Sequence, residues 1–370
     1  MLCLAGREAF AHLFTPGDRK VMSVKRNLPR LNGFDINRRH FLKQSALAAG
    51  GLALGKYLIS PPAMAADITT FKATHGTGLC NCPFFLVKER GLAKNVALDF
   101  VTTPTNADIA SLFGAGLVDV TVVPYTNFIT LFAQGAPIKI VAGSGVQGCV
   151  IVSQQGIDSA EKLRGKTLGT FQADTLEMLP YDYLKKAGMS FADVKVRYFG
   201  TSPELAQAFI NGNIDAMCHI EPYATQAFNA RPGAIRLSDG VDIYGKNYSD
   251  CVLAVRSSVL AENREAVKEL IKGMMIGQHQ EEADRASAVK DTVGKYFKTS
   301  YEATLDAAAK QPAMIDQRQN QDFILQRANN LKELRYIQKV PGAEIFDWSL
   351  LNEVIKENPN LYASLELKSA

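Results

Sequence analysis

The sequence predicts an α/β protein of two lobes, with two crossing strands between them and a helical C-terminal segment packed on the first lobe. Short β-rich runs alternate with helical patterns from Asp67 onward. The alternation restarts after residue 153, and the pattern turns helical beyond Ser257. Because strand, helix and strand in succession are typical of parallel βαβ units, we expect a largely parallel sheet in each lobe.

The first lobe is expected to alternate regularly. Strands are predicted at 68–73, 96–101, 118–123 and 138–142, and helices at 84–92, 107–115 and 127–134. The run 118–123 is apolar almost throughout, which fits a strand buried on both faces. Gly91 and Gly135 are stop signals for two of these helices. A strand at 148–153 then leaves the lobe.

The second lobe repeats the alternation, and the chain then returns. Strands are predicted at 166–171, 194–199 and 214–220, helices at 174–187, 203–211 and 222–228, and the returning strand at 249–255. Helices follow at 260–284, 286–297, 301–309 and 321–337. The predicted organisation is a leader at 1–65, lobe one at 66–150, lobe two at 151–248, and the return with the C-terminal helices at 249–370.

The net charge of +4 comes from the N-terminal leader. Residues 1–66 hold ten Lys and Arg against three Asp and Glu, which leaves 31 basic and 34 acidic residues in the rest of the chain. A nucleic-acid partner is therefore not expected. With 47% hydrophobic and 21% charged residues, the composition is that of a globular chain.

The leader predicts export to the periplasm. Residues 37–43 contain Arg38 and Arg39 before a short apolar stretch at 45–59, and small residues at Ala63 and Ala65 suit a signal peptidase. Paired arginines in this setting resemble a twin-arginine signal. An ordinary secretory signal remains the alternative, and Met22 is a second candidate start. The apolar stretch is too short, and too rich in Gly and Ala, to be a typical membrane span.

Several segments resemble periplasmic solute-binding proteins of the nitrate/sulfonate/taurine type, the NMT1/THI5-like family. Their order and spacing carry the resemblance: the helix at 83–92, the turn at 115–120 with Asp119, the linker at 154–166, the turn at 212–216 with Asp215, the stretch 221–224 and the motif at 344–349. From the residues themselves, Asp119 and Asp215 are expected to bond local backbone N–H groups in tight turns.

The resemblance implies a class II binding-protein fold that captures a small solute between its lobes. It also implies partners, namely a membrane permease and its cytoplasmic ATPase, and a solute of the sulfonate, nitrate, taurine or thiamine-pyrimidine class. It implies no cofactor. A monomer is expected.

Ligand contacts are predicted where strands end, because parallel sheets bind ligands at the carboxyl ends of their strands. The candidates are His75, Thr77, Cys80, Asn81, Cys82, Tyr125, Thr126, Asn127, Gln147, Gln172, Asp174, Thr175, His219, Glu221 and Tyr223. For each of them a turn, capping or core role is the alternative. Asp174 is also a plausible helix N-cap, with Glu177 three residues later.

Asp174 and Glu221 favour a neutral or cationic solute, such as an amine or a heteroaromatic compound, because a carboxylate at a helix N-terminus opposes an anion. Tyr125, Tyr223 and Phe171 are candidates for stacking on a flat ring. His279 lies in a charged helical pattern and is expected at the surface.

Five cysteines follow the leader, an odd number. Small buried hydrophobic residues are the expectation for Cys149, Cys218 and Cys251. A disulfide is compatible with the periplasm. A soft-metal or thiol-ligand site using Cys80, Cys82, Cys218 and His219 (with His75) is the alternative, although the spacing is not that of a strong metal motif.

The sequence contains neither a Gly-x-Ser-x-Gly elbow nor a phosphate loop, and it predicts a non-catalytic receptor. An enzyme on the same fold, similar to the family's pyrimidine-synthesising members, is the other alternative. Those members carry a triple-cysteine run that is missing here.

Overall fold

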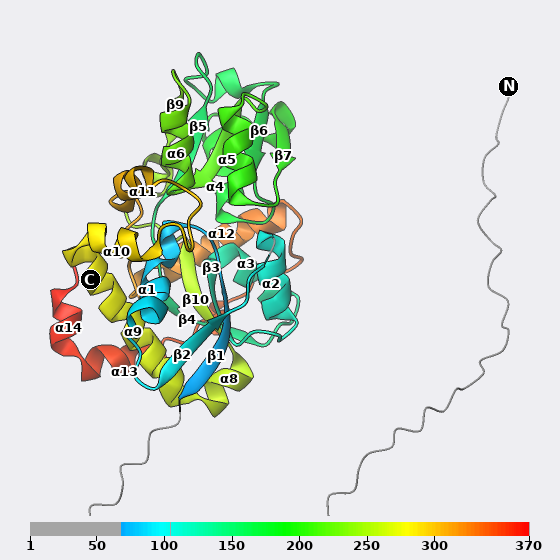
Figure 1. Ribbon diagram of the computed structural model, residues 1–370. Coiled ribbons are helices and arrows are strands. Elements are labelled where there is room, and N and C mark those ends of the chain that lie inside the picture. Colours follow the sequence, from blue (N-terminus) through cyan, green and yellow to red (C-terminus); the bar gives the residue numbers. More distant parts are fainter. Residues whose placement is uncertain (1–67, 104, 370) are drawn as a thin grey trace, which may run out of the picture. The chain divides into compact units, whose positions relative to one another are not determined.

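The computed structural model describes residues 68–103 and 105–369 (Figure 1). The predicted leader, with Arg38 and Arg39, lies outside the described residues. In the described part of the chain, no helix combines the length and the apolarity needed to cross a membrane.

The first sheet holds five strands in the order β2-β1-β3-β10-β4. Their bounds are β1 Thr69–His75, β2 Val96–Phe100, β3 Val120–Pro124, β4 Ile138–Gly143 and β10 Cys251–Arg256. Strand β1 pairs in parallel with β2 and β3, whereas β10 is antiparallel to β3 and β4. This sheet and the helices α1 Cys82–Arg90, α2 Asn106–Gly114 and α3 Tyr125–Ala133 form lobe one.

The second sheet repeats this plan in the order β7-β6-β8-β5-β9. Its strands are β5 Cys149–Ser153, β6 Thr167–Thr170, β7 Lys195–Tyr198, β8 Ala216–Ile220 and β9 Ile235–Ser238. Here β5 is the antiparallel strand, between β8 and β9. With α4 Thr175–Lys186, α5 Ser202–Ile210, α6 Tyr223–Ala230 and α7 Val241–Tyr244, this sheet forms lobe two (green in Figure 1).

The chain passes between the sheets twice, after β4 and before β10. The two connecting segments run side by side, because Val146 and Ser249 form an antiparallel bridge. The Gln147 N–H also donates to the Tyr248 carbonyl at 2.9 Å. The predicted fold class, two α/β lobes joined by two crossing segments, is confirmed. The residue numbers predicted for the domain boundaries stay a prediction.

The C-terminal helices mostly cover lobe one. They are α8 Ser257–Glu262, α9 Arg264–Ala283, α10 Arg285–Thr292, α11 Tyr301–Ala308, α12 Gln321–Glu333, α13 Ser349–Glu357 and α14 Pro359–Ser364. Helix α9 packs on α1, and α13 packs on α9. Helix α11 instead contacts α6 of lobe two, where Lys310 Nζ lies 3.1 Å from Thr225 Oγ1.

Some predicted elements differ from the structure. The helix predicted at 260–284 is broken at Asn263, whose ψ of 37° is not helical, and Asn has a lower helix propensity than Ala, Leu or Glu. The helix predicted at 286–297 ends at Thr292, just before Gly294 at φ +80°. Strand β9 and the helices α7, α13 and α14 were not predicted. Strand β9 is a half-buried edge strand with little apolar signal.

The two Gly-Asp turns have the same role in both lobes. Asp119 Oδ2 accepts a hydrogen bond from the Lys72 N–H at 2.9 Å, and Asp215 Oδ2 accepts from the Thr167 N–H at 2.8 Å. Both partners are backbone donors on the neighbouring strand, so the expectation of local donors was wrong. Each aspartate thereby joins two parallel strands at the end opposite the cleft.

Candidate functional site

A cavity lies between the lobes, at the carboxyl ends of β1, β3 and β8 and beside the first turn of α4. It holds about 440 Å³ of space not filled by atoms, a volume that includes solvent at its open side. Its lining residues come from both lobes and from the start of β10: Gly76, Thr77, Gly78, Cys80, Asn81, Ile109, Val123, Pro124, Asn127, Asp174, Thr175, Leu176, Ser202, Ile220, Asp250 and Cys251. This is where parallel sheets present ligand sites.

The lobe-one wall is a close-packed loop that runs into the short helix η1 Leu79–Asn81. A Cβ at Gly78 would lie 2.8 Å from Ile220 Cγ1 of lobe two, so the absence of a side chain lets the lobes approach. Asn81 is fully buried, and its Oδ1 atom has no hydrogen-bond partner. A buried acceptor of this kind suits a donor from a ligand.

Two buried carboxylates dominate the floor of the cavity. Asp174 caps α4 by accepting from the Leu176 N–H at 3.0 Å, which confirms the predicted N-cap. Asp250 accepts from Thr175 Oγ1 at 2.6 Å and from Gln311 Nε2 at 3.0 Å. The Cys251 thiol, at 3.2 Å, is a further donor to Asp250. The residues that line the cavity include neither lysine nor arginine.

Burial shifts the pKa of both carboxyls upward. Removal from water raises the pKa of Asp174 to about 7, and the nearby Asp250 carboxyl adds to the shift. The pKa of Asp250 is also raised by burial, although its hydrogen bond from Thr175 opposes the change. A carboxyl without a cationic partner favours its neutral form. A bound cation would favour the ionised form of both groups.

The lobes touch directly around the cavity. Thr77 Oγ1 of lobe one and Ser202 Oγ of lobe two share a hydrogen bond of 2.8 Å. The Leu79 N–H donates to the Glu221 carbonyl at 2.9 Å. Together with the bond between Thr175 and Asp250, these contacts join lobe two to lobe one and to the crossing segment.

Part of the predicted set lies together around the cavity. Six predicted residues line it: Thr77, Cys80, Asn81, Asn127, Asp174 and Thr175. His75 and Tyr223 line an adjoining groove that shares Thr77 and Ser202 with the cavity. Gln172 and Phe171 line a second adjoining groove, which shares Asn127 and Asp174 with it.

The other six predicted residues lie outside these spaces, because each is committed to the protein itself. Cys82 is buried beneath α9 and α10, and Tyr125 packs edge-on against Phe323. Thr126 is buried in α3, and Gln147 Oε1 accepts from the Asn247 N–H at 2.8 Å. The remaining two are His219 and Glu221.

His219 and Glu221 have local structural roles. His219 is fully buried, Nε2 lies 2.9 Å from the Ser202 carbonyl oxygen, and burial lowers its pKa to about 4. Glu221 accepts from both the N–H and the hydroxyl of Thr225 at 2.9 Å, so it binds within the first turn of α6. We expected Asp174 and Glu221 to be the acidic side chains of the cleft, whereas the structure places Asp174 and Asp250 there.

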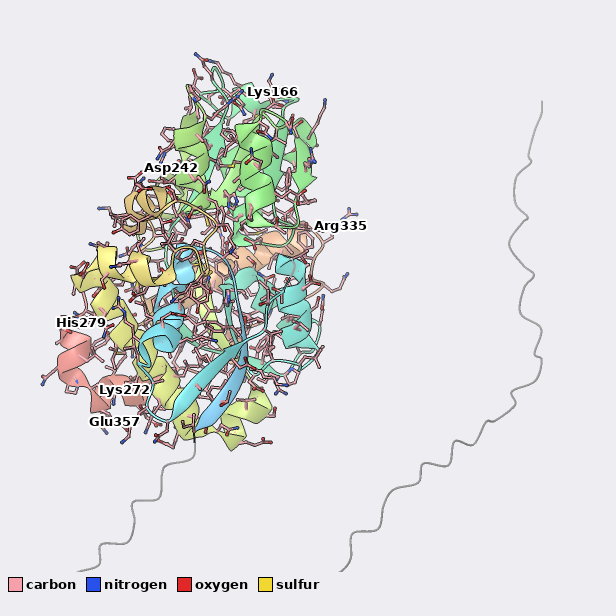
Figure 2. All side chains as sticks on the ribbon, viewed as in Figure 1. Lys166, Asp242, Lys272, His279, Arg335 and Glu357 are labelled. Atoms are coloured by element: carbon pink, nitrogen blue, oxygen red, sulfur yellow. The ribbon has the colours of Figure 1, made fainter. Side chains whose placement is uncertain are left out.

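The proposed stacking residues do not converge on one ring site. Tyr223 stacks on His219 at 5.1 Å, and its hydroxyl accepts from the Lys298 N–H at 3.0 Å. Tyr125 and Phe171 lie in different hydrophobic clusters. His279 lies at the outer edge of the molecule in Figure 2, and its Nδ1 is 3.3 Å from the Ser364 hydroxyl of α14.

The predicted metal ligands do not form one cluster either. In residues 68–103 and 105–369, one group of three potential metal ligands has donor atoms that all lie within 4.8 Å of one another. Its members are Cys80, Asp250 and Cys251. Cys82 is not a member of this group; burial raises the pKa of its thiol, and the Glu281 carboxyl adds to the rise.

Sequence reasoning missed Asp250, Cys251 and Ser202 as wall residues. A usable signal for Asp250 was present, since a lone carboxylate directly precedes the apolar returning strand. Ser202 carried little signal, because Ser before a Pro is also an ordinary helix start.

Two α/β lobes with matching sheet orders, joined by paired crossing segments beside an interlobe cavity, define the class II periplasmic binding-protein fold. The model of the NMT1/THI5-like family matches residues 83–280. The chain belongs to this family.

The relatives agree with this assignment. A protein of Brucella abortus that is named as a binding protein is 29% identical over 228 residues, 61% of this chain and 70% of its own length. The zinc-bound ligand-binding component of an ABC-type import system from Staphylococcus aureus superposes with a TM-score of 0.68 at 16% identity, over 77% of this chain and 99% of that one. The alkanesulfonate-binding protein SsuA of Xanthomonas axonopodis pv. citri, bound to MOPS, gives 0.65 at 16% identity, over 76% and 99%.

Proposed function

We propose that the chain is the exported solute receptor of an ABC importer. Its lobes would close over a small molecule and present it to a membrane permease that works with a cytoplasmic ATPase. Family membership, the interlobe cavity and the names of the related proteins support this proposal. We further propose that the protein acts as a monomer in the periplasm and catalyses no reaction.

We propose that the solute carries a positive charge or several hydrogen-bond donors. The observation that carries this proposal is the pair of buried carboxylates, Asp174 and Asp250, in a cavity whose lining includes no basic side chain. An ionised carboxylate repels a nitrate or an alkanesulfonate strongly in a dry site, so such an anion would require both acids to stay protonated. An amine would instead compensate the cost of burying both carboxylates.

The adjoining groove suits an aromatic extension of such a solute. His75 contacts Phe100 and Tyr296 edge-on, with ring centroids 4.8 and 5.4 Å apart. These three side chains line the groove together with Lys88 and Lys298. A heteroaromatic amine could place its charged end on the carboxylates and its ring on this aromatic wall.

Binding of defined compounds tests the proposal. Purified protein is titrated calorimetrically with a panel of primary, quaternary and heteroaromatic amines, and with nitrate and alkanesulfonates. We expect amines to bind. Asp250→Asn should weaken their affinity more than tenfold, which is about 1.4 kcal/mol. Glu221→Gln is the matched control and should leave affinity within about twofold, since Glu221 binds inside α6.

Two results would count against the proposal. Tight binding of nitrate or a sulfonate that Asp250→Asn does not weaken would reject the cationic solute. Steady turnover of any bound compound would reject a purely binding role and favour the enzyme alternative. Native mass spectrometry of protein isolated from its own periplasm would show the mass of a retained solute.

A further inference from the structure

Two cysteine sulfurs meet in the wall of the cavity. Cys80 lies in the loop after β1, Cys251 begins β10, and the two are 171 residues apart in the chain. Their Sγ atoms are 2.7 Å apart, and both side chains are buried free thiols. A disulfide bond is about 2.05 Å long, so bonding requires an approach of only about 0.7 Å.

The crossing segment holds the two backbones in place. The Ser144 N–H donates to the Cys251 carbonyl at 3.1 Å, and the Ser144 hydroxyl donates to the Cys80 carbonyl. The Cys251 N–H in turn donates to the Gly145 carbonyl at 3.2 Å. A Cβ on Gly145 would lie 2.3 Å from the Cys80 Cα, so this residue packs directly against the backbone of Cys80. The sulfurs therefore face each other because of fixed backbone contacts.

The other described cysteines have different surroundings, and Cys218 is buried in the hydrophobic core of lobe two. The Cys149 thiol points at Thr175 Oγ1 and Asp250 Oδ1, at 3.8 and 3.6 Å. Cys82 lies in a separate cluster with Leu86 and Ala288. The fold therefore places the sulfur of Cys80 next to that of Cys251.

We propose that Cys80 and Cys251 form a reversible disulfide in the wall of the ligand cavity, through exchange with an external disulfide. One thiolate attacks a sulfur of the external disulfide and releases one thiol. The second thiolate then attacks the mixed disulfide and releases the other. The two protein thiols lose two protons and two electrons, and the external disulfide is reduced to two thiols.

The disulfide would change the carboxylate site beside it. In the reduced protein the Cys251 thiol donates to Asp250 Oδ2 at 3.2 Å. A disulfide has no S–H, so Asp250 would lose this donor and could accept one from a solute instead. This consequence rests on the proposed cation-binding function, whereas the disulfide itself does not.

Oxidation is best tested during refolding, because exchange requires the thiolate and burial raises the pKa of the Cys80 thiol to about 12. The full chain is reduced in guanidinium and refolded with reduced and oxidised glutathione. It is then quenched in acid, unfolded again and alkylated with iodoacetamide. Peptide mass mapping locates the protected cysteines.

We expect one peptide pair linked through Cys80 and Cys251, lighter by two hydrogen atoms and released by dithiothreitol, with Cys82, Cys149 and Cys218 alkylated. Cys218→Ser should keep this link, and Cys251→Ser should leave Cys80 alkylated. The proposal is overturned if both cysteines of the wild-type chain are alkylated, carry glutathione, or are linked elsewhere. Protection that a chelator removes would indicate a metal and would also overturn it.

A second readout does not depend on the variants folding. The link closes a loop of 171 residues, and such a link stabilises by restricting the unfolded chain. We expect the oxidised wild-type protein to unfold at a Tm several degrees above that of the reduced protein. A Tm of the oxidised protein equal to or below that of the reduced protein, with the link present in the peptide map, would show that the link strains the fold and would reject it as a native bond.

Discussion

At the scale of single residues, four aspartates illustrate how position decides the role of one residue type. Asp119 and Asp215 join parallel strands through backbone donors. Asp174 and Asp250 instead occupy the cavity, where burial opposes their ionisation. The same side chain is a structural acceptor in the turns before β3 and β8, and it lines the cavity between the lobes at Asp174 and Asp250.

The raised pKa of Asp174 predicts a pH-dependent stability. Its ordinary value is 3.8, and it is about 7 in the folded protein, so the folded chain holds the proton more tightly than the unfolded chain. The resulting stabilisation is complete below about pH 4 and is lost as the pH rises through 7. From this group alone, the free energy of unfolding should fall by roughly 2–4 kcal/mol across that interval.

Asp174→Asn should remove that part of the pH dependence while keeping the helix cap, since Asn caps as well as Asp. Urea unfolding of both proteins between pH 5 and pH 8 measures the difference. The exposed Asp99→Asn is the control and should leave the slope unchanged. If the free energy of unfolding of Asp174→Asn falls with pH as steeply as that of the wild type, the pH dependence comes from other buried acids, such as Glu281.

At the scale of elements, α12 connects the two lobes away from the cavity. Its apolar side chains, including Ile324 and Leu331, pack in the cluster that also holds Phe128 of α3. Its polar side reaches α4 of lobe two, where Arg327 Nη1 lies 2.6 Å from Asp182 Oδ2 and Glu333 pairs with Lys185 at 2.9 Å. Helix α12 therefore packs on lobe one through its apolar face and forms ion pairs with lobe two through its charged side chains.

Removal of Arg327 should weaken this contact between the lobes. Arg327→Ala leaves a largely buried Asp182 without its cation, and a bond to a charged group contributes about 1.5–3 kcal/mol. We expect a lower free energy of unfolding and a larger radius of gyration in small-angle scattering, as the lobes separate. Lys162→Ala removes an exposed ion pair and should change stability by less than about 0.5 kcal/mol. An unchanged radius in Arg327→Ala would mean that α12 does not hold the lobes together.

At the scale of the whole molecule, both lobes follow one construction plan. In each sheet the antiparallel strand, β10 or β5, begins directly after a crossing between the sheets. The two crossings are therefore neighbours and pair with each other at Val146 and Ser249. The cavity lies directly beside these segments, since Asp250 at the end of the second crossing is one of its lining residues.

The leader predicts the export route of the whole chain. If the paired arginines act as a twin-arginine signal, replacing both Arg38 and Arg39 with Lys should leave the precursor in the cytoplasm. Cell fractionation and immunoblotting measure the distribution. Arg30→Lys lies outside the motif and should not change it. Normal export of the double variant would favour the ordinary secretory route.

Most of the fold could be predicted from the sequence, because hydrophobic periodicity and Gly stop signals are local. The strands that became β1 to β8 and β10 were all expected, and Gly91 ends α1 in the left-handed conformation as predicted. The half-buried edge strand β9 and the break at Asn263 escaped prediction. Strand β9 carries little apolar signal, and a single Asn is only a weak signal for a helix end.

The site could be predicted only as a region. Strand ends can be located from sequence, so the cavity was expected near Thr77, Asn81, Asn127 and Asp174, and these residues line it. Which side chains face the cavity depends on partners elsewhere in the chain. Glu221 accepts hydrogen bonds from Thr225 and does not face the cavity. Asp250 lines the cavity because the chain returns there from lobe two.

The sequence by itself determined the two α/β lobes, the family and the approximate position of the cleft, because these follow from local periodicity and from the order of motifs. The tertiary structure alone decided the acidic pair and the facing cysteines. Cys80 and Cys251 are 171 residues apart, and no local pattern indicates that the crossing segment places their sulfurs together. Contacts between residues distant in sequence are set by packing, and packing is a property of the folded chain.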